Sequence, residues 1–104
     1  MSAAFSRKIA TIVDLDIVRT STLSALHRTM RANDPEITKF WKRPDASEWR
    51  DLRTHPQYGP VAQWLYDVEG RSCELKYDLV AELGGDWSLL NALLCDELGR
   101  HRIG

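Results

Sequence analysis

The 104-residue chain has little of what marks catalytic, metal-binding or membrane-spanning proteins. Its two cysteines form no CxxC pair of the kind that binds zinc or performs redox chemistry. No apolar run approaches the roughly 18 residues of a membrane span, and there is no glycine-rich phosphate loop or GxSxG motif. His27, His55 and His101 offer no pair at metal-ligand spacing. We therefore expect no enzyme, no metal site and no cofactor.

Charge of neither sign is in excess. The chain has 14 Lys and Arg against 15 Asp and Glu, which argues against a generic polyanion binder, because such domains are strongly basic. The distribution is uneven, since residues 1–55 carry a net charge of +3 and residues 56–104 carry −4. Two cysteines are too few for a disulfide scaffold, and the apolar run of residues 9–13 is too short for a signal peptide. We therefore expect a soluble protein in the reducing cytoplasm.

The sequence does contain helical periodicity, and it is clearest over residues 60–99. One apolar stripe there has the spacing of a helix of 3.6 residues per turn: Val61, Trp64, Leu65, Val68, Leu75, Leu79 and Leu83. Gly84 and Gly85 tolerate the left-handed conformation that ends helices, and Asp86 can cap the next one. These residues predict an αα-hairpin whose second helix ends at Gly99, leaving His101 in a solvated tail.

The rest of the chain also reads as helical. Residues 1–8 resemble a flexible arm, and apolar positions at helical spacing predict a first helix over residues 9–32. Pro35 follows a capping residue, and Pro44 precedes one. This pattern predicts two short helices within residues 34–55. No alternating strand pattern of useful length occurs. The prediction is a single all-α domain, a small bundle of four to five helices that ends in the hairpin.

The last predicted helix is apolar on more than one face, since eight of its twelve residues from 87 to 98 are apolar. Such a helix is either central to the fold or shared with another subunit. The residues that would carry self-association to a homo-oligomer are Trp87, Leu90 and Leu94.

The two cysteines lie at similar distances from the predicted hairpin turn. Packed helix axes are about 8–10 Å apart, whereas a disulfide needs Cα atoms about 4.4–6.8 Å apart. We therefore expect Cys73 and Cys95 to be two separately buried thiols rather than a disulfide.

A segment that mixes aromatic and basic residues is the best candidate for a partner-binding surface. Its members are Lys39, Trp41, Lys42, Arg43, Trp49, Arg50 and Arg53. Such a mixture can anchor a protein interface or stack bases while its cations meet phosphate. The alternative is that the aromatic residues fill a small core while the basic groups are merely solvated.

Acidic residues recur at intervals of seven and four along the first hairpin helix. We call this set the acidic ridge: Asp67, Glu74, Asp78 and Glu82. Like charges four residues apart on a helix repel one another by about 0.2–0.5 kcal/mol per pair. The ridge is either a solvated face or a surface that meets a basic partner.

Together these features predict a small, non-enzymatic protein–protein interaction module that associates with itself. It would act as an adaptor, inhibitor or regulatory accessory protein, and compact chains of this kind are common among bacterial and phage accessory proteins. The alternative is a nucleic-acid-binding helical module that uses residues 39–53.

Overall fold

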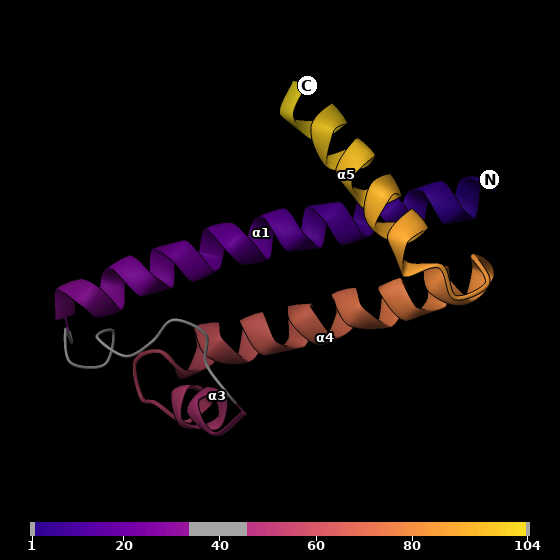
Figure 1. Cartoon of the computed structure of the whole chain (residues 1–104). Helices are drawn as coiled ribbons and strands as arrows, with labels where there is room; N and C mark the ends of the chain where they lie inside the picture. Colours follow the sequence, from indigo (N-terminus) through magenta and orange to yellow (C-terminus); the bar gives the residue numbers. More distant parts are fainter. Residues whose placement is uncertain (1, 34–45, 104) are drawn as a thin grey trace. The chain divides into compact units, whose positions relative to one another are not determined.

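A computed structural model describes residues 2–33 and 46–103 and contains only helices within those ranges. Figure 1 shows the four of them in chain order: α1 (Ala3–Asn33), α3 (Ala46–Arg53), α4 (Gly59–Glu82) and α5 (Trp87–Ile103). The all-α prediction is therefore confirmed. The first of the two short helices predicted within residues 34–55 lies outside the described residues, and the second corresponds to α3.

Contacts divide the chain into two compact units. Unit 1 consists of Met1–Ile17 and Glu69–Gly104, and unit 2 consists of Val18–Val68. Both α1 and α4 contribute residues to each unit, so neither long helix belongs to one unit alone. The single-domain organisation stays a prediction.

The start of α1 differs from the sequence-based expectation. The Ser2 hydroxyl accepts a hydrogen bond of 3.1 Å from the Phe5 backbone N–H, so Ser2 caps the helix. Phe5 is only 5% exposed and belongs to the core of unit 1. The prediction of a loose arm over residues 1–8 is therefore wrong for the described residues, because capping and burial hold that segment in α1.

The core of unit 1 forms where the amino-terminal half of α1 packs with α4 and α5. Its buried residues come from all three helices: Phe5, Ile9, Ile12, Leu79, Val80 and Leu90. Four leucines of α4, of the turn after it and of α5 pack around them while remaining partly buried: Leu75, Leu83, Leu93 and Leu94. Burial of each large apolar side chain contributes about 1.5–3 kcal/mol.

The hairpin turn follows the predicted chemistry. Gly84 and Gly85 have φ angles of 67° and 86°, which lie in the left-handed region. The Gly85 N–H donates to the Val80 carbonyl at 2.8 Å, and Gly84 N–H donates to Ala81 at 3.3 Å, which is the Schellman pattern of a helix end. The Asp86 carboxylate then accepts from the Leu89 N–H at 3.0 Å and caps α5.

The end of α5 contradicts the prediction. Gly99 lies inside the helix, which runs on to Ile103. A Cβ added at Gly99 would meet no atom within 4 Å, and no positive φ is found there. Gly99 therefore costs some helix propensity without ending the helix.

Unit 2 has a core of its own, built from α1, α3, α4 and the turn before α4. The buried members are Leu26, Met30, Leu52, Tyr58, Ala62 and Leu65. In the turn, His55 Nδ1 accepts hydrogen bonds from the backbone N–H groups of Gln57 at 3.0 Å and Tyr58 at 3.3 Å. A Cβ at Gly59 would lie 2.6 Å from the Arg53 carbonyl oxygen, so the close approach of α3 and α4 requires glycine there.

Candidate functional site

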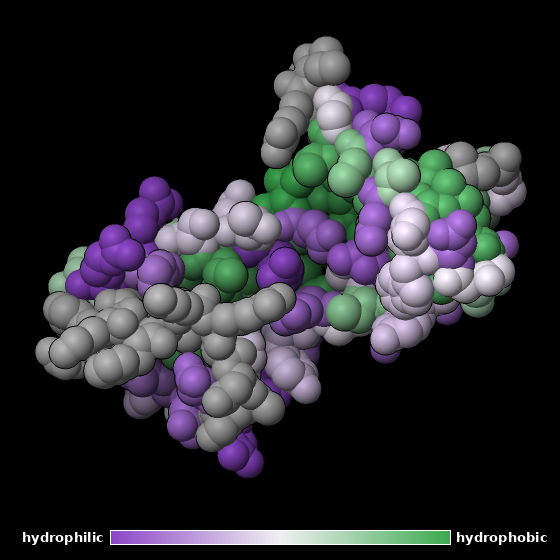
Figure 2. Space-filling view, viewed as in Figure 1, coloured by the Kyte–Doolittle hydropathy of each residue, from purple (hydrophilic) through white to green (hydrophobic). Residues whose placement is uncertain are grey.

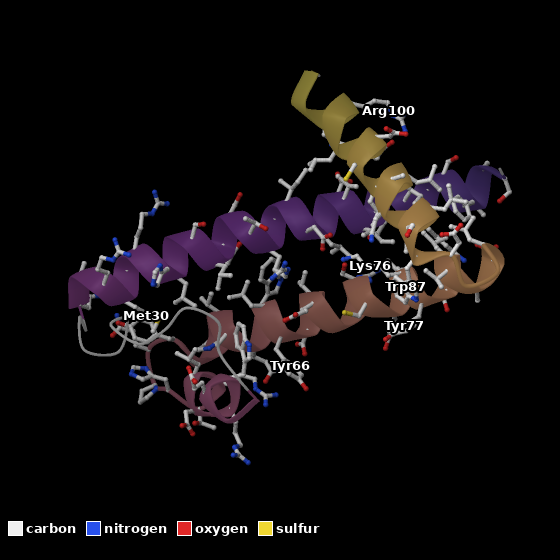
Figure 3. The ribbon with its side chains drawn as sticks, in the orientation of Figure 1. Met30, Tyr66, Lys76, Tyr77, Trp87 and Arg100 are labelled. Atoms are coloured by element: carbon white, nitrogen blue, oxygen red, sulfur yellow. The ribbon has the colours of Figure 1, made fainter. Side chains whose placement is uncertain are left out.

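Among the described residues, the most exposed of the tyrosine, tryptophan and phenylalanine side chains belongs to unit 1. Tyr77 of α4 is 67% exposed, and its ring meets Trp87 at the start of α5 edge to face, with centroids 5.2 Å apart and planes at 90°. Figure 3 shows the two side chains next to each other. Trp87 and Leu89 are 42% and 43% exposed. We call Tyr77, Trp87 and Leu89 the aromatic corner.

The acidic ridge lies at the surface, since all four of its carboxylate residues are exposed. Asp67 belongs to unit 2, where it accepts a hydrogen bond of 2.9 Å from the Gln63 side chain. Glu74, Asp78 and Glu82 belong to unit 1, and within the described ranges none of the three forms an ion pair. Since Glu74 and Asp78 flank Tyr77 along α4, negative charge borders the aromatic corner.

Lys76 does not neutralise this charge. Its ammonium group lies 3.2 Å from Asp16 Oδ2 of α1, and the buried Ser72 hydroxyl donates to Asp16 Oδ1 at 2.9 Å. These contacts tie α1 to α4 within unit 1 and satisfy a buried hydroxyl. Lys76 therefore serves the packing of the two helices, and the ridge keeps its negative charge.

The predicted basic and aromatic segment is only partly visible. Lys39, Trp41, Lys42 and Arg43 lie outside the described residues. Of the remaining three, Trp49 is partly buried against the core of unit 2 and Arg50 is exposed. The Arg53 guanidinium lies 4.0 Å from the centroid of the Tyr66 ring, in a cation–π contact.

This arrangement gives Trp49 and Arg53 structural roles in unit 2. Trp49 fills space beside the core, as the alternative interpretation of this segment expected, and Arg53 joins α3 to α4. Nucleic-acid binding by residues 39–53 stays a prediction.

Polar side chains at the carboxyl-terminal end of α5 contact one another, and one of them, His101, lies close to α1. The Arg100 guanidinium donates to Glu97 Oε2 at 2.7 and 3.1 Å. His101 Nε2 lies 3.4 Å from Glu97 Oε1 and 3.6 Å from Asp14 Oδ1 of α1. The hydrogen bond from Arg100 is the main cause that lowers the pKa of Glu97. His101 is therefore a helical residue with two carboxylate neighbours, and its assignment to a solvated tail is wrong.

Both cysteines are free and exposed, so the expectation that their thiols are buried is wrong. Cys73 belongs to α4 and Cys95 to α5. Among the described residues no group of three or more His, Cys, Asp or Glu side chains is placed to hold a metal ion.

The residues predicted for self-association divide between core and surface. Trp87 is exposed, but Leu90 is fully buried in the core of unit 1 and Leu94 packs against that core. The surface predicted from the three residues is therefore wrong for Leu90. Figure 2 shows apolar side chains, in green, reaching the surface beside α5.

A second surface feature, which the sequence did not reveal, lies in unit 2. An apolar groove of ≈ 320 Å³ is lined by Val18, Thr22, Pro60, Val61 and Trp64. Val61 and Trp64 were assigned to the apolar stripe of the first hairpin helix, yet they remain 38% and 40% exposed. Val18, which lines the same hollow, is 49% exposed. We call this hollow the unit 2 groove.

None of the described helices is long and apolar enough to cross a membrane. The chain matches no known protein-family model, no curated protein and no solved structure.

Proposed function

We propose that this protein is a non-enzymatic protein–protein interaction module, of the adaptor, inhibitor or regulatory kind, and that it binds a basic partner protein through the aromatic corner. The observation that carries the proposal is the exposed Tyr77 ring, which contacts Trp87 and is bordered by carboxylates that form no ion pair with any other described residue.

The residue types of the corner suit a protein interface. Tyrosine and tryptophan are enriched among the few residues that supply most of the binding energy of interfaces. The edge-to-face contact with Trp87 restrains Tyr77 before binding, which lowers the entropy lost when a partner orders the ring. A purely structural role for this pair would stabilise the hairpin by about 0.5–1.5 kcal/mol, but it would not require a tyrosine ring that is 67% exposed.

The charge around the corner indicates the chemistry of the partner. Glu74, Asp78 and Glu82 present negative charge from the same helix as Tyr77. Complementary charge steers association and selects among partners. A partner with Lys and Arg residues around an apolar or aromatic anchor fits this surface, and its binding should weaken as salt rises.

A reducing, cytoplasmic location is part of the proposal. Cys73 and Cys95 are both exposed, and such thiols persist in the reduced form where glutathione and thioredoxin keep them reduced.

Affinity capture from the organism that encodes the protein tests the proposal when wild type and variants are compared. Tyr77→Ala and the double reversal Glu74→Lys with Asp78→Lys should each weaken binding of the same basic protein at least about tenfold. Tyr66→Ala is the matched control, because Tyr66 is also an exposed tyrosine of α4 but lies outside the corner. Circular dichroism checks that each variant keeps its helices.

Retention of a basic protein by wild type and by Tyr66→Ala, with loss by the other two variants, supports the proposal. Partners whose binding is the same for all four proteins would show that the corner is not the binding surface.

A further inference from the structure

We propose that His101 is a pH-sensitive latch, whose protonation fastens the last turns of α5 to α1 within unit 1. The latch consists of His101 and the two carboxylates beside it, those of Glu97 and Asp14. It shares no residue with the aromatic corner, so this proposal holds or fails independently of the basic partner.

The His101 side chain lies between carboxylates from two helices. Its Nε2 is 3.4 Å from Oε1 of Glu97, one turn earlier in α5, and 3.6 Å from Oδ1 of Asp14 in α1. All three residues belong to unit 1, so the packing of that unit fixes their relative positions. The contact with Asp14 joins two helices, and it can therefore hold the end of α5 against α1.

The two protonation states of an imidazole differ in what they offer these carboxylates. Neutral histidine carries no charge and donates from one ring nitrogen, whereas protonated histidine carries a positive charge and donates from both. Distances of 3.4 and 3.6 Å are long for a neutral hydrogen bond. They still lie within the range of an ion pair, which extends to about 4 Å. The contacts of the latch therefore gain most of their strength when His101 is protonated.

The charged groups around His101 carry one net negative charge among the described residues. They are the Asp14 carboxylate from α1, together with the Glu97 carboxylate and the Arg100 guanidinium from α5. Arg100 donates to Oε2 of Glu97 and leaves Oε1 to His101. Asp14 forms no other ion pair with a described residue. Protonation of His101 brings this set of charges to neutrality.

The pH range of the latch follows from the chemistry of its members. Histidine gains and loses its charge between about pH 5 and pH 8. Glu97 stays ionised over that range, because the hydrogen bond from Arg100 lowers its pKa below 4.5. The contribution of the latch is therefore present at the acidic end of this range and is lost as the pH rises through the titration of the imidazole.

The segment that the latch holds carries apolar side chains. Leu94 packs against the core of unit 1, and Leu98, one turn before His101, is half-buried. Release of the last turns at higher pH would increase the exposure of Leu98. The latch thus couples the pH to the apolar surface that α5 presents.

Amide hydrogen exchange of the full chain at about pH 5 and about pH 8 tests the proposal. Each rate is compared with the intrinsic rate at the same pH to give a protection factor. We expect the protection of the last two turns of α5 to fall roughly two- to fivefold between the two pH values, as for an exposed charge pair. Asp14→Asn should lower the protection at about pH 5 and remove most of the pH dependence. His101→Gln should abolish the pH dependence.

Asp96→Asn is the matched control. Asp96 is an exposed carboxylate next to Glu97 in α5, and it forms no ion pair with a described residue. Its substitution should leave the pH dependence unchanged, and circular dichroism verifies that each variant keeps its helices.

The comparison also separates the latch from a local effect of charge at a helix end. A protonated histidine in the last turn interacts favourably with the helix dipole, and that effect does not need α1. Protection in the wild type that is the same at both pH values would overturn the proposal. So would a pH dependence that largely survives Asp14→Asn or His101→Gln, or one that is lost in Asp96→Asn.

Discussion

At the scale of single residues, glycine is required by the backbone conformation at one position and not at another. Gly84 has a φ of 67° and ends α4, whereas Gly70 lies in the middle of the same helix with open space around its Cα. An L-residue in the left-handed region costs about 1–2 kcal/mol. We therefore predict that Gly84→Ala lowers the free energy of unfolding by about that amount, as measured by urea denaturation.

Gly70→Ala provides the matched control. An added methyl group meets nothing within 4 Å at Gly70, and alanine is favoured over glycine in a helix by about 0.8–1.0 kcal/mol. This substitution should raise the free energy of unfolding by roughly that amount. Equal effects of the two substitutions would show that the turn does not impose the left-handed conformation.

At the scale of elements, the sequence predicted what is locally encoded. The sequence predicts the hairpin turn correctly because the φ angles and capping hydrogen bonds of Gly84, Gly85 and Asp86 involve only neighbouring residues. The start of α1 and the end of α5 also involve distant residues, as the burial of Phe5 and the position of His101 beside Asp14 show. Apolar periodicity alone therefore placed both of these ends wrongly, although the Ser2 cap of α1 is a local feature.

Of the candidate surfaces too, the sequence predicted some features and missed others. Spacing correctly placed the acidic ridge on the exposed side of α4. An apolar stripe, however, indicates a face without telling how much of it other helices cover, so the exposure of Val61 and Trp64 was missed. Tyr77 had one available signal, because it is an aromatic residue that lies outside the stripe of its own helix.

The last turns of α5 lead to a prediction about pH. Hydrogen bonding from Arg100 lowers the pKa of Glu97 below its ordinary value of 4.5. The ionised carboxylate is therefore favoured in the folded state, and its contribution is present above pH 4.5 and is lost as the pH falls through the lowered pKa. We predict that the amide hydrogens of the carboxyl-terminal turns of α5 have lower protection factors at such acidic pH, that is, exchange rates closer to the intrinsic rates at that pH, as measured by nuclear magnetic resonance.

The substitution Arg100→Gln tests whether Arg100 causes the lowered pKa of Glu97. This substitution removes the guanidinium whose hydrogen bond lowers the Glu97 pKa most, and it should return that pKa toward 4.5 in a carbon-detected titration. An unchanged pKa in the variant would contradict the assignment of the shift to Arg100.

At the scale of the whole molecule, distant parts of the sequence build each unit. Unit 1 joins the first 17 residues of the chain to those from Glu69 onward, and unit 2 is formed by the intervening segment. The core of unit 1 therefore depends on the amino-terminal turns of α1, which supply Phe5, Ile9 and Ile12. Such non-local contacts are the part of the architecture that helical periodicity does not encode.

Phe5 gives the sharpest test of this dependence. Truncation of a buried phenylalanine costs about 3–5 kcal/mol, which is a large share of the roughly 5–15 kcal/mol that stabilises a typical protein. We predict that Phe5→Ala lowers the free energy of unfolding by that amount in chemical denaturation. Phe5→Leu, which keeps most of the apolar volume, should cost less than about 1.5 kcal/mol. If Phe5→Ala leaves stability unchanged, the first turns of α1 behave as the flexible arm that the sequence suggested, and the core of unit 1 closes without them.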